Sequence, residues 1–192
     1  MLEPPVEFLI VAVMAVVVGY ILFRNSLFAA DQKVKSAWAG IEVQMKRRHQ
    51  LVPNLLKAVS AAMRHEQAII DKVVEARRAA AQSLETHDPE RVQKAEAELS
   101  ASLRSFFAYA EHTPEITATT NIRTLQQQLE EAEDQIAAAR RIYNGNVEAY
   151  NTRILSIPWN FIAKRHDFQA RPMLQLDAGE RDAVYRPVEV SL

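Results

Sequence analysis

The amino-terminal part of the chain contains an uncharged apolar run. From Phe8 to Phe23, sixteen residues include no Asp, Glu, Lys or Arg. A helix of this length spans about 24 Å, and apolar residues on both sides extend it toward the ~30 Å thickness of a bilayer core. A cleaved signal peptide starts with basic residues, but the segment MLEPPVE ahead of the run has none. The pattern therefore predicts an uncleaved, single transmembrane helix.

After the run, apolar residues recur at two positions of a seven-residue repeat along residues 31–84. Twelve of the fourteen repeat positions are apolar, and Arg48 and Glu66 are the two exceptions. This spacing predicts one long helix with an apolar stripe that packs on other helices. Pro53 lies inside the repeat, and because the stripe continues on both sides of it we expect a kink rather than a helix end. The apolar stripe positions are Val34, Trp38, Ile41, Met45, Val52, Leu55, Val59, Ala62, Ile69, Val73, Ala76 and Ala80.

Two further helices follow. Asp88-Pro89-Glu90 combines an N-cap residue, a first-turn proline and a first-turn acid, so a second helix starts there. Start signals of a third helix occur at Thr113 and again at Asn121, and Pro158 ends it. The apolar faces are Val92, Ala95, Leu99, Leu103, Phe106 and Ala110 in the second helix, and Ile122, Leu125, Leu129, Ala132, Ile136, Ala139, Tyr143, Val147, Tyr150 and Ile154 in the third.

These elements predict an all-α fold, in which a transmembrane helix precedes a long antiparallel bundle of three helices. At about 1.5 Å per residue, the three helices are about 80, 37 and 60 Å long. This mismatch in length predicts that part of the first helix's stripe stays uncovered. Either the first helix folds back near Pro53, which would make four helical segments, or copies of the chain pack against each other.

Near the end of the chain, the regular spacing of apolar residues gives way to a short aromatic and basic segment. The segment 156–165 (SIPWNFIAKR) places Trp159 and Phe161 beside two cations. Two interpretations fit: a short helix on the bilayer surface, or aromatic side chains packed on the end of the bundle. We expect the residues beyond it to be extended or loosely structured. The domain boundaries are then 1–30 for the N-terminal segment and anchor, 31–163 for the helical bundle and 164–192 for the tail.

Composition and charge narrow the function classes. The chain has no cysteine and only four glycines, which excludes disulfides and thiolate metal sites and suits long helices. The net charge is −1, so nothing global indicates a nucleic-acid partner. Residues 24–57 carry seven Lys and Arg against two acids, whereas no Lys or Arg precedes the apolar run. The positive-inside rule then predicts an outer N-terminus and a cytoplasmic C-terminal domain.

Several polar residues lie on faces that should be buried. Arg48 and Glu66 interrupt the stripe, and each needs a partner on another helix because an unpaired buried charge is costly. The run 46–49 (KRRH) presents cations all round the helix, and it either pairs with acids such as those at 130–133 or contacts phosphate or lipid headgroups.

A second polar pattern recurs after seven residues, as Tyr143-Asn144 and Tyr150-Asn151. Both tyrosines share one helix face, and a buried tyrosine needs a partner for its hydroxyl. We expect these hydroxyls to form hydrogen bonds between helices.

No enzymatic motif occurs. The five histidines form no HExxH pair, and P-loop, GxSxG and GxGxxG patterns are all missing from the sequence. We therefore expect a protein that is not an enzyme, with no cofactor, no metal site and no small-molecule substrate.

With these residues in view, the chain resembles the LemA family of bacterial membrane proteins. The resemblance implies an anchored helical bundle without an agreed biochemical activity, and one branch of the family is associated with building a membrane compartment. The matching stretches are AWAGIEVQMKRRHQLVPNLLKAV (37–59), HE (65–66), AR (76–77), LQQQLEEAEDQIAAARRIYNGNVEAYN (125–151) and SIPWNFIA (156–163). Candidate binding residues are Glu66 from the stripe and, at characteristic family positions, Arg47, Arg48, Asn54, Tyr143, Asn144, Tyr150 and Asn151.

The expected function is that of a non-enzymatic, membrane-anchored helical scaffold in the bacterial inner membrane. We expect it to self-associate as a homo-oligomer or to dock other membrane proteins, and to contact membrane lipid. An adaptor or sensor in envelope stress signalling or membrane proteolysis is the alternative.

Overall fold

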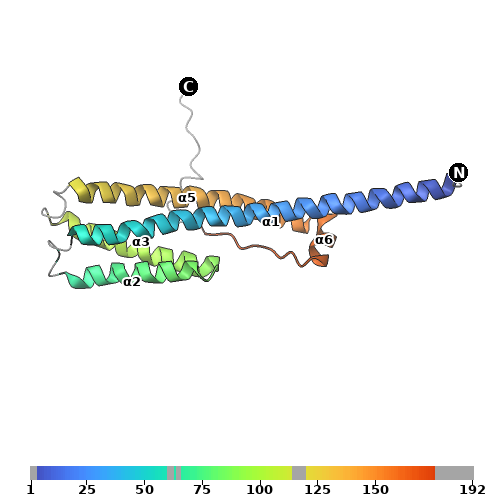
Figure 1. Ribbon diagram of the computed structural model, residues 1–192. Helices are drawn as coiled ribbons and strands as arrows, with labels where there is room; N and C mark the ends of the chain where they lie inside the picture. The colour runs from blue at the N-terminus through green and yellow to red at the C-terminus, as the bar shows by residue number, and fades with distance from the viewer. Residues whose placement is uncertain (1–3, 60–62, 64–65, 114–119, 176–192) are drawn as a thin grey trace, which may run out of the picture. The chain divides into compact units, whose positions relative to one another are not determined.

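The structure of the chain, a computed structural model, describes residues 4–59, 63, 66–113 and 120–175. The fold is all-α, as the sequence predicts, and this part of the chain contains no strand (Figure 1). Two compact units make it up: Met1–Trp38 with Ile142–Met173, called the first unit here, and Ala39–Arg141 with Leu174–Leu192, the second unit. The helices are α1 (Pro4–Val59), α2 (Gln67–Leu84), α3 (Pro89–Glu111), α5 (Thr120–Leu155) and α6 (Trp159–Arg165).

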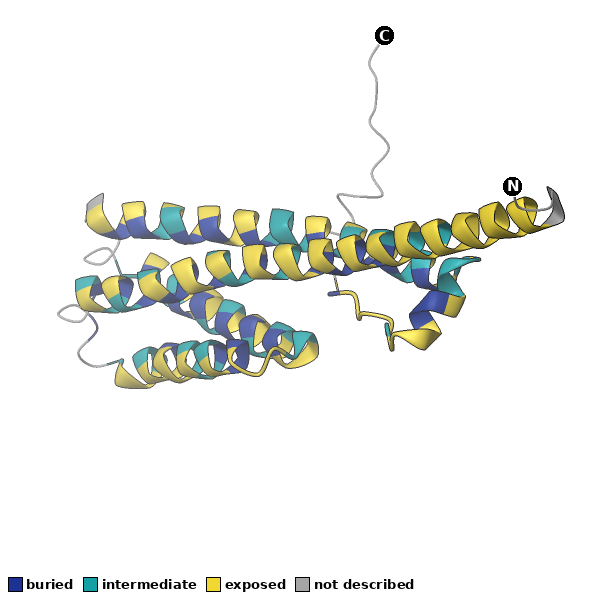
Figure 2. Cartoon of the chain, turned by 45° about the vertical axis from the view of Figure 1, so that its right-hand side comes forward, coloured by how far each residue is buried: buried dark blue, intermediate teal, exposed yellow. Residues whose placement is uncertain are grey.

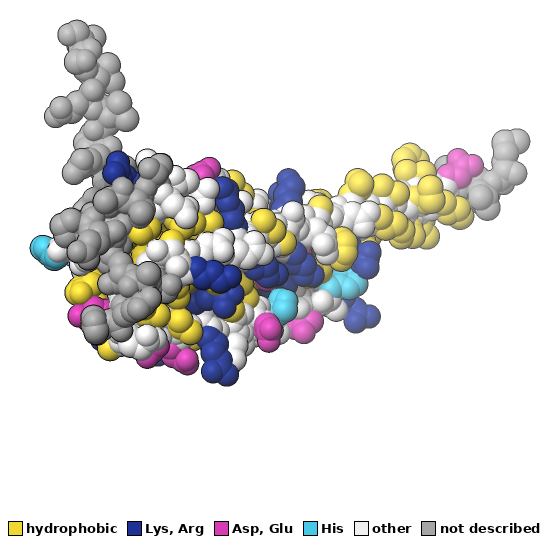
Figure 3. Space-filling view, turned by 60° about the vertical axis from the view of Figure 1, so that its left-hand side comes forward, with side chains coloured by type: hydrophobic (Ala, Val, Ile, Leu, Met, Phe, Trp, Pro, Cys, Tyr) yellow, Lys and Arg dark blue, Asp and Glu magenta, His cyan; other side chains and the backbone are white. Residues whose placement is uncertain are grey.

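In the first unit, the N-terminal half of α1 exposes apolar side chains on all sides (Figure 2). Large apolar residues from Val6 to Leu22 are exposed, and Phe8 and Val16 reach 79% and 72%. This part of α1 is long and apolar enough to cross a membrane, and none of its most apolar window is buried. The space-filling view shows hydrophobic side chains gathered along it (Figure 3).

The remainder of the first unit has an ordinary packed core. From Leu27 onward α1 buries one side chain per turn against the C-terminal part of α5, because the apolar residues of both helices recur at helical spacing. Trp38 lies edge-on to Tyr143, with ring centroids 5.5 Å apart. The buried apolar side chains of this unit are Leu27, Ala30, Val34, Tyr143, Val147, Tyr150, Ile154, Ile162 and Ala163.

In the second unit, four helical segments share one core. The C-terminal part of α1, together with α2, α3 and the N-terminal part of α5, encloses a continuous apolar cluster. Asp88 caps α3 as predicted, since its carboxylate accepts hydrogen bonds from the backbone N–H groups of Glu90 and Arg91. The fully buried members of the cluster include Val52, Leu55, Val59, Met63, Val73, Ala80, Leu99 and Phe106.

The prediction of one helix over 31–84 is wrong. α1 runs through Pro53, which therefore does not end it, but it stops at Val59, and α2 begins at Gln67. The alternative with four helical segments matches the structure, with the break six residues beyond Pro53. Neither Gly nor Pro marks residues 60–66. The break therefore follows from tertiary packing, which buries the stripe of α2 against the other helices of this unit.

The prediction of an uncovered stripe is also wrong. All described stripe residues are buried or half-buried within the single chain, and Ile41, Leu55 and Val73 are completely buried. Ala62 lies outside the described residues, as does most of the start signal at 113–115. Among the described residues, the fold therefore leaves none of the predicted stripe exposed for a second copy of the chain to cover.

Candidate functional site

A network of charged side chains, buried on α1 and α3 and exposed at Glu133 on α5, joins three helices of the second unit. Arg48 of α1 is 2% exposed, and its two terminal nitrogens donate to three acceptors. They contact the Glu96 carboxylate on α3 at 3.2 Å, the Ser100 hydroxyl at 2.7 Å and the Glu133 carboxylate on α5 at 2.7 Å. Because charge-assisted hydrogen bonds replace the lost hydration, the guanidinium can be buried.

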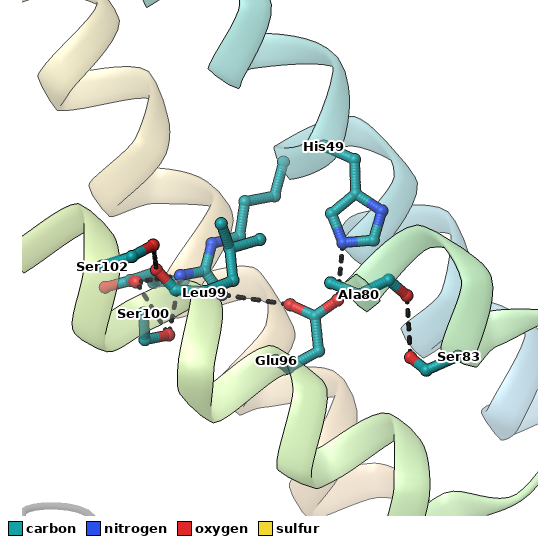
Figure 4. A network of polar contacts seen from close by, with 9 residues as sticks. His49, Ala80, Ser83, Glu96, Leu99, Ser100 and Ser102 are labelled. Atoms are coloured by element: carbon teal, nitrogen blue, oxygen red, sulfur yellow. Dashed lines mark hydrogen bonds and ion pairs between the residues drawn. The ribbon is translucent and has the colours of Figure 1, made fainter. Parts of the chain in front are cut away.

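Glu96 is the centre of this network (Figure 4). One carboxylate oxygen accepts from Arg48, and the other lies 2.6 Å from Nε2 of His49. Both Glu96 and His49 are 4% exposed. Both oxygens of this carboxylate therefore make contacts within the fold, one to α1 through Arg48 and one to α1 through His49.

A second polar contact repairs the helix around Pro53. Proline has no backbone N–H, so the carbonyl of His49, four residues earlier, loses its usual helical donor. Arg77 of α2 supplies one, because its Nε donates to that carbonyl at 2.9 Å. A side chain from the neighbouring helix thus satisfies the carbonyl that Pro53 orphans, and α1 continues to Val59.

Two hollows border the network. One has a volume of about 310 Å³ and is lined by Glu96, Ser100 and Arg104 among others, and the other, of about 440 Å³, is lined by His49 and Arg77 among others. Among the described residues, no group of three His, Asp or Glu side chains could hold a metal ion. The contacts that the described residues of the network make are thus contacts between helices of the same unit.

In the first unit, the Tyr-Asn repeat holds an extended segment, residues 167–173, called the C-terminal strap. The Tyr143 hydroxyl donates to the carbonyl of Pro172 at 3.1 Å, and the Tyr150 hydroxyl donates to that of Gln169 at 2.9 Å. The Asn151 amide donates to the carbonyl of Arg171 and accepts from its N–H, both at 2.9 Å. The acceptors of the tyrosines are thus backbone carbonyls of the strap, and the prediction of hydrogen bonds between helices is wrong.

An ion pair fastens the same strap to α1. Arg171 lies 2.9 Å from the carboxylate of Asp31, which is 4% exposed and also pairs with Lys35 at 2.8 Å. Burial acts to raise the pKa of Asp31, but the hydrogen bonds from Lys35 and Arg171 outweigh it and hold the pKa below the ordinary value of 3.8. Burial raises the pKa of both Tyr143 and Tyr150, so their hydroxyls stay protonated as donors.

The sequence-predicted residues do not form one site. Arg48 finds partners on other helices, as expected, and Arg47 pairs with Glu131 at 3.3 Å on the surface of the second unit. Asn54 is exposed on α1, and Glu66 is half-buried at the start of α2, where its side chain does not cap the helix. Tyr143, Tyr150 and Asn151 belong to the first unit and hold the strap, next to a half-buried Asn144.

Sequence reasoning missed four residues that organise these contacts. Glu96 follows Val92 by four residues and precedes Leu99 by three, so its place on the apolar stripe of α3 was a usable signal. Pro53 implies an orphaned carbonyl at residue 49, which predicts a donor but not that Arg77 provides it. Nothing in the sequence pattern pairs Asp31 with Arg171, 140 residues later.

If Arg77 compensates for Pro53, the two residues must be energetically coupled. Arg77→Met should lower the free energy of unfolding by about 1–3 kcal/mol, because it leaves the partly buried His49 carbonyl without a donor. In a Pro53→Ala background the new N–H at position 53 can donate to that carbonyl, so the same substitution should cost clearly less. Denaturant unfolding of the detergent-solubilised chain, followed by helical circular dichroism, measures the cycle.

The matched control is Arg78→Met, the same change at the exposed neighbouring position. It should cost little in either background. Equal costs of Arg77→Met with and without Pro53 would show that the two residues act independently.

The Asp31 ion pair predicts a pH-dependent stability. Because the folded-state pKa of Asp31 is depressed, its contribution is fully present above the unfolded-state pKa and is lost as the pH falls through the folded value. Asp31→Asn should therefore lower the thermal midpoint at neutral pH, and the difference from wild type should shrink as the pH drops below 3.8. Glu148→Gln, an exposed acid of the same unit, is the control, and a difference that persists unchanged at low pH would contradict the assignment.

Comparison with known proteins identifies the family of the chain. A family model described as the LemA family matches residues 37–190, which is most of the chain. The matched range includes the network around Arg48, the Pro53–Arg77 pair and the Tyr-Asn repeat, but not Asp31. No curated protein matches the chain. The chain belongs to the LemA family.

Proposed function

We propose that the chain is a non-enzymatic scaffold, in which a single transmembrane anchor carries an antiparallel helical bundle at the membrane surface. The observation that carries this proposal is the exposed apolar half of α1. Its side chains from Val6 to Leu22 are exposed, and water would hydrate this surface at a large free-energy cost. Lipid is the solvent in which such a helix is stable.

The packing of α5 on α1 directly after the apolar run supports a scaffold role. α1 is one uninterrupted helix from Pro4 to Val59, so the same element is apolar on all sides at one end and part of a packed core at the other. Arg153 of α5 donates to the carbonyl of Ser26 at 3.1 Å, directly after the apolar run. The part of α5 that packs on α1 in the first unit would therefore stay near the bilayer rather than move on a flexible tether.

The orientation follows from charge. The basic residues that flank the anchor on its C-terminal side favour a bacterial inner-membrane protein with an outer N-terminus and a cytoplasmic body. Absence of enzymatic activity is supported by the commitment of Glu96, Arg48 and Tyr143 to contacts within the fold.

The partners are further copies of the chain, other membrane proteins and lipid. Because the stripe of α1 and α2 is buried within one chain, it no longer argues for self-association. Contacts between chains would have to use other surfaces, of which the lipid-facing side of the anchor is the most apolar. The role of adaptor or sensor stays a prediction that no single contact favours.

Charges in the middle of the run should remove the chain from the membrane. In a Val13→Arg/Val17→Arg variant, each arginine at the centre of a span costs roughly 2.5–3.5 kcal/mol on insertion. Wild-type chain should stay in the membrane fraction through an alkaline wash, and the variant should be released. In cells, crosslinking in the membrane should give species larger than one chain for the wild type alone.

The control variant is Val43→Arg/Val74→Arg, which makes the same change at two exposed valines of the second unit. It should remain membrane-bound. Release of the wild-type chain by the alkaline wash would contradict the anchor, and a membrane-bound chain that crosslinks to nothing would contradict the scaffold.

A further inference from the structure

Three large apolar side chains that are near one another in the sequence are exposed where α5 gives way to α6. Leu155 is 78% exposed, Ile157 is 74% exposed and Phe161 is 68% exposed. These three residues, called the turn patch, lie within seven positions of the sequence and belong to the first unit. Exposed apolar residues scattered singly are ordinary, but a cluster of this kind indicates a contact with an apolar partner.

The turn patch does not lie on a loose tail, because the residues between and around its members pack on α1. Trp159 meets Phe23 edge-on, with ring centroids 5.1 Å apart. His166 lies 2.7 Å from the Tyr20 hydroxyl. Ile162 and Ala163 are buried, so one face of α6 is turned inward while Phe161 on the same helix is turned outward.

These contacts fix the position of the turn patch along α1. Tyr20 and Phe23 form the last turn of the uncharged apolar run, which ends at Arg24. The run of sixteen residues is about 24 Å long, whereas a bilayer core is ~30 Å thick, so its end lies within the core or at its boundary. Side chains that are held beside Tyr20 and Phe23 therefore lie at the boundary of the bilayer core as well.

The polar residues near the turn patch suit that boundary as well. Arg24, Lys164 and Arg165 are all exposed, and each has an aliphatic stem that can lie in the apolar layer while its charge reaches the phosphates. Aromatic and aliphatic residues flanked by cations are the usual composition of a segment that lies in the membrane interface.

We propose that Leu155, Ile157 and Phe161 insert into the interface of the bilayer that the anchor spans. The occupant of this surface is therefore lipid, and α6 is a second membrane contact beside the transmembrane part of α1. Insertion adds apolar depth at the end of a short span and fixes the rotation of α1, since only one side of the helix carries α6. This inference rests on the proposed anchor.

The absence of native cysteine allows a direct test with single spin labels on the full chain. Ile157→Cys and Phe161→Cys carry a nitroxide on the turn patch, and Val17→Cys carries one on the anchor. Ile142→Cys is the matched control, because Ile142 is an apolar residue of the same unit with a similar exposure of 63%, thirteen residues before Leu155 on α5. The labelled chains are placed in vesicles of phosphatidylcholine and phosphatidylglycerol.

Power saturation then compares collisions with oxygen, which concentrates in lipid, and with a water-soluble nickel complex. We expect the oxygen-to-nickel ratio at 157 and 161 to be several-fold higher than at 142 and lower than at 17, because oxygen concentrates toward the middle of the bilayer. A high ratio at 17 with water-like values at 157 and 161 would overturn this inference and leave the anchor intact. Low access to both reagents at 161 would mean that protein covers the patch, which also overturns it.

A water-like value at 17 would instead contradict the anchor itself and, with it, the proposed function. The two failures are therefore distinguishable within one set of samples.

Discussion

The structure depends on one helix that must be stable in two surroundings. The N-terminal half of α1 exposes apolar side chains in every direction, whereas the C-terminal half buries one stripe and presents polar residues elsewhere. Backbone hydrogen bonds within a helix make both halves possible, because they satisfy the peptide groups without help from the solvent. The change occurs between Phe23 and Leu27, where α5 and α6 first pack on α1.

Buried polar contacts then decide how the other helices pack on α1. Arg48, His49 and Pro53 lie within about two turns of α1. The side chains of Arg48 and His49, and the backbone carbonyl that Pro53 leaves without a donor, each need a polar partner. The Glu96 carboxylate contacts both side chains, and the Arg77 side chain donates a hydrogen bond to the carbonyl that Pro53 leaves without a donor. Such contacts contribute less to net stability than apolar packing. A shift of register would leave a buried charge or carbonyl unpaired, which is costly. In the first unit, Asn151 and the two tyrosines fix the strap in the same way, by hydrogen bonds to specific backbone groups.

The sequence predicted those features of the fold that depend on neighbouring residues alone, such as helix starts and apolar helix faces. The start of α3 at Asp88 and the apolar faces of α3 and α5 follow from capping and spacing, and the structure confirms them. The break after Val59 has no local marker, since it depends on the burial gained when α2 packs in the same core. The predicted uncovered stripe failed for the same reason. The partners of Asp31 and of the Tyr-Asn repeat lie in a strap without periodicity, so only the folded chain shows them.

The central claim is that, in a bilayer, the apolar run continues without a break into the packed part of α1 in the first unit. Nitroxides at Val13→Cys and Lys33→Cys, two exposed positions of the first unit, are twenty residues apart. In a lipid nanodisc, double electron–electron resonance should give a single narrow distribution near the ~30 Å that a straight helix requires. A broad distribution, or a clearly shorter distance, would mean that α1 bends or unfolds between positions 13 and 33, and it would contradict this claim.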